Sequence, residues 1–262
     1  MDLGLRNRVY VVTGAAGGLG LACAEQLVAE GARLVLCDRD EEALAKAAVL
    51  LGGPDRAIPV AGDLTEAGIE TCLVAAAVAR YGRLDGAVVH VGAGDRGSAV
   101  DTEDGTWRLA FEALFLAPLR LCRAVARNAS HEGGSLVLVL PSRDGAEEAV
   151  AGGLSPALAG TARSLADELG PRTVRVNAIV PGRFETGAGG DTSRVAGHGT
   201  VPGAAHATTT EEAAPAGGDH VALGRPGDPL EFARPAVFLL SPAASYVTGT
   251  VLTVDGGRTR AS

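Results

Sequence analysis

Residues 9–20 of this 262-residue chain read VYVVTGAAGGLG. The first five form an apolar run that predicts a buried β-strand over Val9–Thr13, and a predicted helix follows the glycine-rich turn. A strand, a glycine-rich turn and a helix in this order predict a pyrophosphate site at the helix N-terminus, where backbone N–H groups meet negative charge.

The glycines of this turn have separate predicted roles. Gly14 permits the tight turn, Gly18 lets the backbone approach phosphate groups, and Gly20 lets the helix pack close to the strand. We therefore expect a dinucleotide to lie against Gly14, Gly17, Gly18, Leu19 and Gly20.

An acidic residue, Asp38, ends the second predicted strand. A carboxylate there can accept both ribose hydroxyls of NAD and repel the 2′-phosphate of NADP, so NAD(H) is the favoured cofactor. Two alternatives stay open. Arg39 could bind that phosphate, so NADP(H) is not excluded, and Asp38 could instead cap the next helix.

Apolar strands alternate with helical segments to the end of the chain. This βαβ alternation predicts an α/β fold, a single doubly wound Rossmann domain over residues 1–262 with about seven parallel strands and helices on both faces. The predicted strands are Val9–Thr13, Arg33–Cys37, Ala57–Ala61, Gly86–Val91, Ser135–Leu140, Val174–Val180 and Val251–Val254. The predicted helices lie near 18–30, 40–51, 66–81, 103–128, 156–169 and 229–240.

Residues 187–221 interrupt this pattern, because they are rich in Gly, Ala, Thr and Pro and lack apolar periodicity. A segment of this length without periodicity predicts a flexible, lid-like insert.

The composition excludes several classes of protein. A net charge of −8 argues against nucleic-acid or anionic-membrane partners. The start of the chain does not resemble a targeting peptide, and its apolar runs are too short to span a bilayer, so a cytoplasmic protein is expected. The four cysteines, Cys23, Cys37, Cys72 and Cys122, lack metal-ligand spacing. We predict no metal site and four small buried thiols in a reducing compartment.

Several motifs in order make nearly the whole chain resemble the short-chain dehydrogenase/reductase family. Residues 13–20 resemble its TGxxxGxG motif and residues 175–186 its RVNxxxPGxxxT segment. Residues 245–249 and 254–257 resemble its SYxTG and VDGG elements. The resemblance implies the strand order 3-2-1-4-5-6-7.

The resemblance also extends the cofactor site beyond the glycine-rich turn. It implies that Asp63 and Leu64 lie beside the adenine. It places Pro181, Gly182 and Thr186 beside the nicotinamide and its phosphates. The family's NNAG motif becomes VHVG at residues 89–92, so His90 and Gly92 are also expected at the cofactor.

The proton-transfer residues of the family are replaced in this chain. The family uses a Tyr as acid or base and a Lys four residues later, on the same helix face, to lower the Tyr pKa. Motif alignment places Ala151 and Ser155 at these positions, and Leu114 at the position of a supporting Asn. The only lysine of the chain is Lys46, on the adenosine side.

No residue is a clear replacement, so the catalytic residues are unknown. The family's Ser position falls on Pro141, and the neighbouring Ser142 is one candidate. His90 is another, although a packed strand histidine is the commoner role for such a residue. The insert carries three further histidines, His198, His206 and His220.

The helix that should carry the Tyr and Lys also looks altered. Gly152-Gly153 disfavours helix, and Ser155-Pro156 is typical of an N-cap followed by a first helical residue. We predict that regular helix begins near Ser155, with Ala151 outside it, so that restoring Tyr and Lys would not restore activity.

Three functions fit these residues. The chain could be a pseudoenzyme that keeps the dinucleotide, acting as a sensor or as a non-catalytic subunit beside an active relative. It could be an active ketone/alcohol oxidoreductase with an unusual proton donor. It could be an interaction module without cofactor, which the intact glycine-rich turn argues against. The family's pairing through the helices after the fourth and fifth strands implies a homodimer, a homotetramer or a heteromer.

Overall fold

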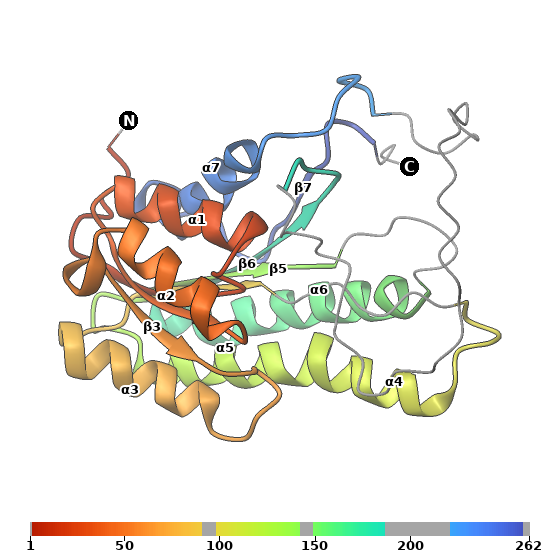
Figure 1. The fold of residues 1–262 in the computed structure, drawn as a ribbon, viewed down its shortest axis with the longest axis horizontal. Helices are drawn as coiled ribbons and strands as arrows, with labels where there is room; N and C mark the ends of the chain where they lie inside the picture. The colour runs from red at the N-terminus through yellow and green to blue at the C-terminus, as the bar shows by residue number, and fades with distance from the viewer. Residues whose placement is uncertain (1, 91–97, 142–148, 187–220, 259–262) are drawn as a thin grey trace.

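The computed structural model describes residues 2–90, 98–141, 149–186 and 221–258 (Figure 1). Its centre is one parallel sheet of seven strands in the order β3-β2-β1-β4-β5-β6-β7, which confirms the predicted fold class and strand order. The strands are β1 (Val9–Thr13), β2 (Arg33–Asp38), β3 (Ala57–Ala61), β4 (Gly86–His90), β5 (Gly134–Val139), β6 (Val174–Pro181) and β7 (Val251–Val254).

Helices cover both faces of the sheet. They are α1 (Gly18–Ala29), α2 (Glu41–Leu50), α3 (Ile69–Tyr81), α4 (Asp104–Phe111), α5 (Ala117–Asn128), α6 (Ala149–Leu169) and α7 (Pro229–Leu240). Short helical turns are η1 (Gly53–Asp55), η2 (Glu112–Leu116), η3 (Gly170–Arg172) and η4 (Pro242–Ala244). Helices α1, α2 and α7 lie on one face, and α3 to α6 lie on the other (Figure 1).

The alternating side chains of the strands build two cores. In β1, Val9 and Val11 point into the core under α3 to α6, whereas Tyr10 and Val12 point into the core under α1, α2 and α7. Both faces of the strand are therefore buried, which explains why the sequence shows a continuous apolar run instead of a polar–apolar alternation.

The predicted start of the fifth predicted helix, which the structure shows as α6, is wrong. Helix α6 runs without interruption from Ala149 to Leu169 and contains Pro156. Val150, Ala151, Ser155 and Leu158 are buried at helical spacing. Packing against the core has therefore overridden the local preferences of Gly152-Gly153 and of Pro156. A proline inside a helix lacks an N–H to donate, and its ring crowds the carbonyl four residues before it.

The segment predicted as one helix over 103–128 contains a wide turn. Between α4 and α5, η2 is a π-helix in which the Ala117 N–H donates to the Glu112 carbonyl. Pro118 follows directly and has no N–H to donate to the Leu114 carbonyl. A widened turn is one of the ways in which a helix accommodates such a gap.

The prediction of four buried thiols is wrong for one residue. Cys23, Cys37 and Cys122 are buried, and burial raises the pKa of each thiol to about 12. Cys72, on α3, is exposed. Within the described ranges, no helix is long and apolar enough to cross a membrane.

Candidate functional site

The predicted cofactor residues meet at the carboxyl edge of the sheet. β1 pairs with β2 on one side and with β4 on the other. The order in which successive strands are added across the sheet therefore reverses between β1 and β4. Ligands of open α/β sheets bind at such a point, outside the carboxyl ends of the strands.

The glycine-rich turn after β1 has the predicted geometry. Gly14 has a φ of +63°, in the left-handed region that favours glycine. A Cβ at Gly20 would overlap the carbonyl oxygen of Gly14, so glycine is required where α1 passes β1. Both roles predicted from the sequence are confirmed.

The first turn of α1 is arranged for an anion. Its N-cap, Gly17, makes no side-chain capping bond, and no acidic residue lies in the first turn. No atom of the described residues lies within 4 Å of a Cβ built on Gly17. Within the described structure, the N-terminal N–H groups therefore lie beside open space, as the pyrophosphate of a dinucleotide requires. Leu19 and Gly20 behind them are buried.

Asp38 belongs to this site and does not cap α2. Its Oδ2 accepts a hydrogen bond from the Ala16 N–H at 3.1 Å, and its Oδ1 accepts from the Arg39 N–H at 2.7 Å. The cap of α2 is Asp40, whose carboxylate accepts from the Ala43 N–H. The carboxylate of Asp38 thus ties the end of β2 to the glycine-rich turn, a link that the sequence did not reveal.

Arg39 is held by the other acidic residue of this edge. Its Nη1 lies 3.5 Å from Oδ2 of Asp63. Burial raises the pKa of Asp63, but hydrogen bonds from Thr65 and the charge of Arg39 outweigh it, and the net pKa is lowered. The guanidinium that could bind a 2′-phosphate is therefore paired, and the neighbouring Leu64 packs against the core.

His90, at the end of β4, packs against the glycine-rich turn. Its Nδ1 would lie 2.6 Å from a Cβ at Gly14. Its backbone N–H donates to the Thr13 hydroxyl, which donates in turn to the His90 carbonyl. Burial lowers the pKa of the imidazole to about 4, against a smaller opposing effect of Asp38. The ring is therefore neutral near pH 7 and belongs to the floor of the site.

The loop after β6 is fixed by the C-terminal elements. The Gly182 N–H donates to the Val254 carbonyl, and a Cβ at Gly182 would collide with Asp255. Pro181 ends β6, and Thr186 is the last described residue before the insert. These residues lie at the same sheet edge as the glycine-rich turn, as the resemblance implies.

Two other residues of the RVN motif have structural roles. The Arg175 guanidinium donates to the carbonyls of Leu239, Leu240, Ser241 and Val247, which holds the C-terminal end of α7. The Asn177 side chain donates to the Val247 carbonyl and accepts from the Thr250 N–H. Neither side chain is available for a cofactor.

The positions that motif alignment assigns to the family's Tyr and Lys lie within regular helix and carry neither residue. Ala151 and Ser155 lie one turn apart on α6, and each has 4% of its surface exposed. Leu114 is buried within the π-turn η2. The position that motif alignment assigns to the Asn therefore lies in a widened turn.

None of the three tyrosines lies on α6. Tyr10 is buried in β1 with its hydroxyl 3.5 Å from the Leu240 carbonyl, and burial raises its pKa. The Tyr81 hydroxyl donates to the Pro54 carbonyl, and Tyr246 is fully exposed after η4. Lys46 pairs with Glu42 on α2.

Several candidates lie outside the described residues. They are Gly92, Ser142 and the histidines of the insert, His198, His206 and His220. Within the described part of the chain, no group of three or more His, Cys, Asp or Glu side chains could hold a metal ion.

Comparison with known proteins agrees with this geometry. A family model described as "Enoyl-(Acyl carrier protein) reductase" matches residues 14–259. The short-chain reductase protein NovJ of Streptomyces niveus is 33% identical, over 97% of this chain and 94% of the relative. The chain belongs to the short-chain dehydrogenase/reductase family, and its relatives are named dehydrogenases and reductases.

Solved structures of the family carry either nicotinamide cofactor. L-sorbose reductase from Gluconobacter frateurii, complexed with NADPH and L-sorbose, has a TM-score of 0.83 and 27% identity, over 100% of both chains. A 7α-hydroxysteroid dehydrogenase complexed with NADH has a TM-score of 0.80 and 26% identity, over 98% of this chain and 96% of that one.

Proposed function

We propose that this chain is a pseudoenzyme of its family, which binds NAD(H) without carrying out the usual reduction of ketones or oxidation of alcohols. It would act as a dinucleotide sensor or as the non-catalytic subunit of a heteromer. A bound nicotinamide would supply or accept the hydride, but hydride transfer to a ketone also needs a proton for the developing alkoxide.

The observation that carries this proposal is the pair Ala151 and Ser155. Helix α6 presents them on one face, four residues apart, where a Tyr and a Lys would act together. A methyl group cannot transfer a proton, and an alcohol cannot lower a neighbouring pKa as an ammonium does. Loss of a general acid alone costs roughly 10²–10⁴ in rate.

The preference for NAD(H) is part of the proposal and rests on Asp38. Its carboxylate lies beside the N–H groups of the glycine-rich turn, where the 2′-phosphate of NADP would be repelled. Arg39, the residue that could attract that phosphate, lies within ion-pair distance of Asp63.

A second function is an active oxidoreductase with a different proton donor. The continuity of α6 and the whole-length similarity to named enzymes favour it. Ser142, His90 and the histidines of the insert are the candidates. His90 is the weakest candidate for a proton donor. With a pKa of about 4, its imidazole is neutral near pH 7 and is not present as the protonated, acidic form.

One pair of measurements separates the two functions. NADH and NADPH are titrated by fluorescence. NADH oxidation is then followed with a broad panel of ketones, and NAD⁺ reduction with a broad panel of alcohols. Tight NADH binding with negligible turnover is expected. Robust turnover of any simple ketone or secondary alcohol would instead establish the active enzyme.

The proposal includes an oligomer of at least two subunits in the cytoplasm. Phe111 and Phe115 stack at 5.0 Å on the α4–η2 segment, with Phe111 exposed and Leu109 71% exposed. On α6, Gly160 has open space above it, which lets another helix approach. Light scattering after gel filtration tests this, and a monomer at micromolar concentration would contradict it. The buried free thiols fit a reducing compartment.

A further inference from the structure

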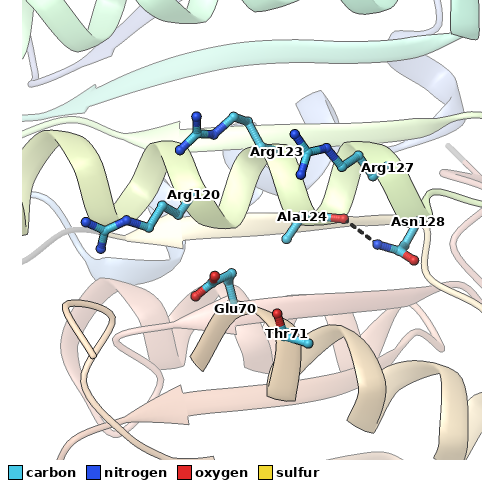
Figure 2. A pocket seen from close by; sticks show the side chains of 7 residues that line it. All are labelled: Glu70, Thr71, Arg120, Arg123, Ala124, Arg127 and Asn128. Atoms are coloured by element: carbon cyan, nitrogen blue, oxygen red, sulfur yellow. Dashed lines mark hydrogen bonds between the residues drawn. The ribbon is translucent and has the colours of Figure 1, made fainter. Parts of the chain in front are cut away.

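A charged groove lies between α3 and α5, away from the dinucleotide residues. Arg120, Arg123 and Arg127 project from α5, and the Glu70 side chain points toward α5 from the first turn of α3 (Figure 2). The cavity has a volume of about 340 Å³, and Asn128 also lines it. In a chain of net charge −8, three guanidinium groups at one groove form a local positive site.

Two of the arginines have no acidic partner in the part of the chain that the structure describes. Arg120 forms an ion pair with Glu112 of η2. Among the described residues, Arg123 and Arg127 form no ion pair within 4 Å, and both are exposed. Neighbouring guanidinium groups repel one another unless an anion lies between them, so this pair favours a ligand with anionic oxygens.

Glu70 requires a hydrogen-bond donor from the ligand, whereas the arginines require acceptors. Its Oε2 is buried and has no hydrogen-bond donor within the described structure. A buried acceptor without a donor is unfavourable, so a ligand that completes the groove should bring an O–H or N–H to this oxygen. The site therefore needs anionic acceptors for Arg123 and Arg127 and a hydrogen-bond donor for Glu70.

We propose that this groove binds inorganic phosphate, which carries charged oxygens and a P–OH together near neutral pH. The charged oxygens would accept from Arg123 and Arg127, and the P–OH would donate to the Glu70 carboxylate. Inorganic phosphate keeps at least one proton near neutral pH, whereas sulfate keeps none. Sulfate would leave Glu70 without a donor and place its charge beside a carboxylate. The proposal is independent of any reaction at the nicotinamide site.

The test is calorimetric titration of the full chain at pH 7 with inorganic phosphate and, separately, with sulfate. Phosphate should bind at least tenfold tighter than sulfate. Arg123→Gln with Arg127→Gln should weaken phosphate binding at least tenfold, because both charged donors are lost. Glu70→Gln should abolish the preference for phosphate, because the amide tolerates sulfate.

Two controls make the outcome specific. Arg234→Gln removes an exposed arginine from α7, on the opposite face of the sheet, and should leave phosphate affinity unchanged. NADH titration of each variant should match the wild type. Equal affinity of the wild type for phosphate and sulfate, or phosphate binding that survives the double arginine change, would overturn the proposal. The wild-type comparison decides even if the Glu70 variant fails to fold.

Discussion

The carboxyl edge around β1 and β2 and the first half of α6 have diverged from the family in different ways. Around the glycine-rich turn, both the backbone and the side chains suited to a dinucleotide are present, from Gly14 to Asp38. In α6 the helix is complete, and Ala151 and Ser155 stand where motif alignment predicts the family's Tyr and Lys. If catalysis has been lost, as proposed, core packing through buried residues such as Val150 and Leu158 would maintain this helix without its chemistry.

The most direct test of this difference is to introduce the Tyr and Lys side chains into α6. Restoration was expected to fail because the sequence predicted that regular helix begins near Ser155. Helix α6 is continuous through Ala151 and Ser155, so this reason does not apply. Ala151→Tyr with Ser155→Lys should raise NADH-dependent reduction of a responsive ketone at least about 100-fold above the wild type, the lower end of what a general acid contributes. Single-turnover kinetics measures this rise.

The matched control for restoration is Ala151→Phe with Ser155→Met, which adds similar bulk without an acid or an amine. It should stay at the wild-type rate. If both double variants fold, bind NADH and remain inactive, the cause lies elsewhere in the site, with Leu114 at the Asn position as the first suspect.

A second change sharpens the role of the glycine-rich turn. Gly20→Ala forces a methyl group into the Gly14 carbonyl, and it should cost about 3 kcal/mol of unfolding free energy and most of the NADH affinity. Urea unfolding and fluorescence titration measure the two losses.

Gly17→Ser is the control for the turn. Its backbone is extended, a serine can cap α1, and no described atom obstructs the side chain. It should keep its stability and lose NADH affinity, because the new side chain enters the space beside the helix N-terminus. Unchanged NADH affinity would mean that the dinucleotide does not lie there.

A third prediction concerns His90 and pH. The folded protein holds the imidazole neutral with a pKa of about 4, below its ordinary value of 6.5. Between these values the unfolded chain binds a proton that the folded chain excludes, so stability falls as the pH drops. His90 should contribute a loss of about 2 kcal/mol between pH 7 and pH 5.

The pH effect is measured by urea unfolding of the wild type and of His90→Asn at both values. The variant should lose correspondingly less stability on acidification. An identical loss in both proteins would show that His90 is hydrated in the folded state.

The smallest expected effect concerns the choice of cofactor. Wild-type protein should bind NADH several-fold tighter than NADPH, and Asp38→Ala should narrow that difference because the repulsive carboxylate is gone. Asp40→Ala, which removes the α2 cap, should cost about 1 kcal/mol of stability and leave the ratio unchanged. Equal affinities in the wild type would instead make Arg39 a phosphate ligand.

The sequence predicted those features that depend on neighbours along the chain. Gly14 and Gly20 stand next to the strand and helix that require them, and the strands were placed to within one residue. The start of α6 was missed, because Gly152-Gly153 and Pro156 favour a break and only the buried Val150 and Leu158 oppose it.

Features formed by distant segments could not be predicted from local patterns. The spacing of Arg120, Arg123 and Arg127 marks a basic helix face, but nothing near them points to Glu70, which α3 brings to the same groove. The ion pair of Arg39 with Asp63 and the bonds of Arg175 to the end of α7 likewise depend on the assembled sheet.

The π-turn at Glu112–Leu116 sets the phase between α4 and α5. A wide turn contains one residue more than an ordinary α-helical turn. If residues 112–116 were ordinary α-helix, that additional residue would rotate α5 about its own axis by about 100° relative to α4. Such a rotation would swing Leu121, Cys122 and Val125 of α5 out of the core. Deleting Ala113 together with Pro118→Ala should remove the surplus residue while both flanks keep their positions. This point of the helix is therefore where the chain should tolerate shortening by one residue, a change that most helix interiors do not accept.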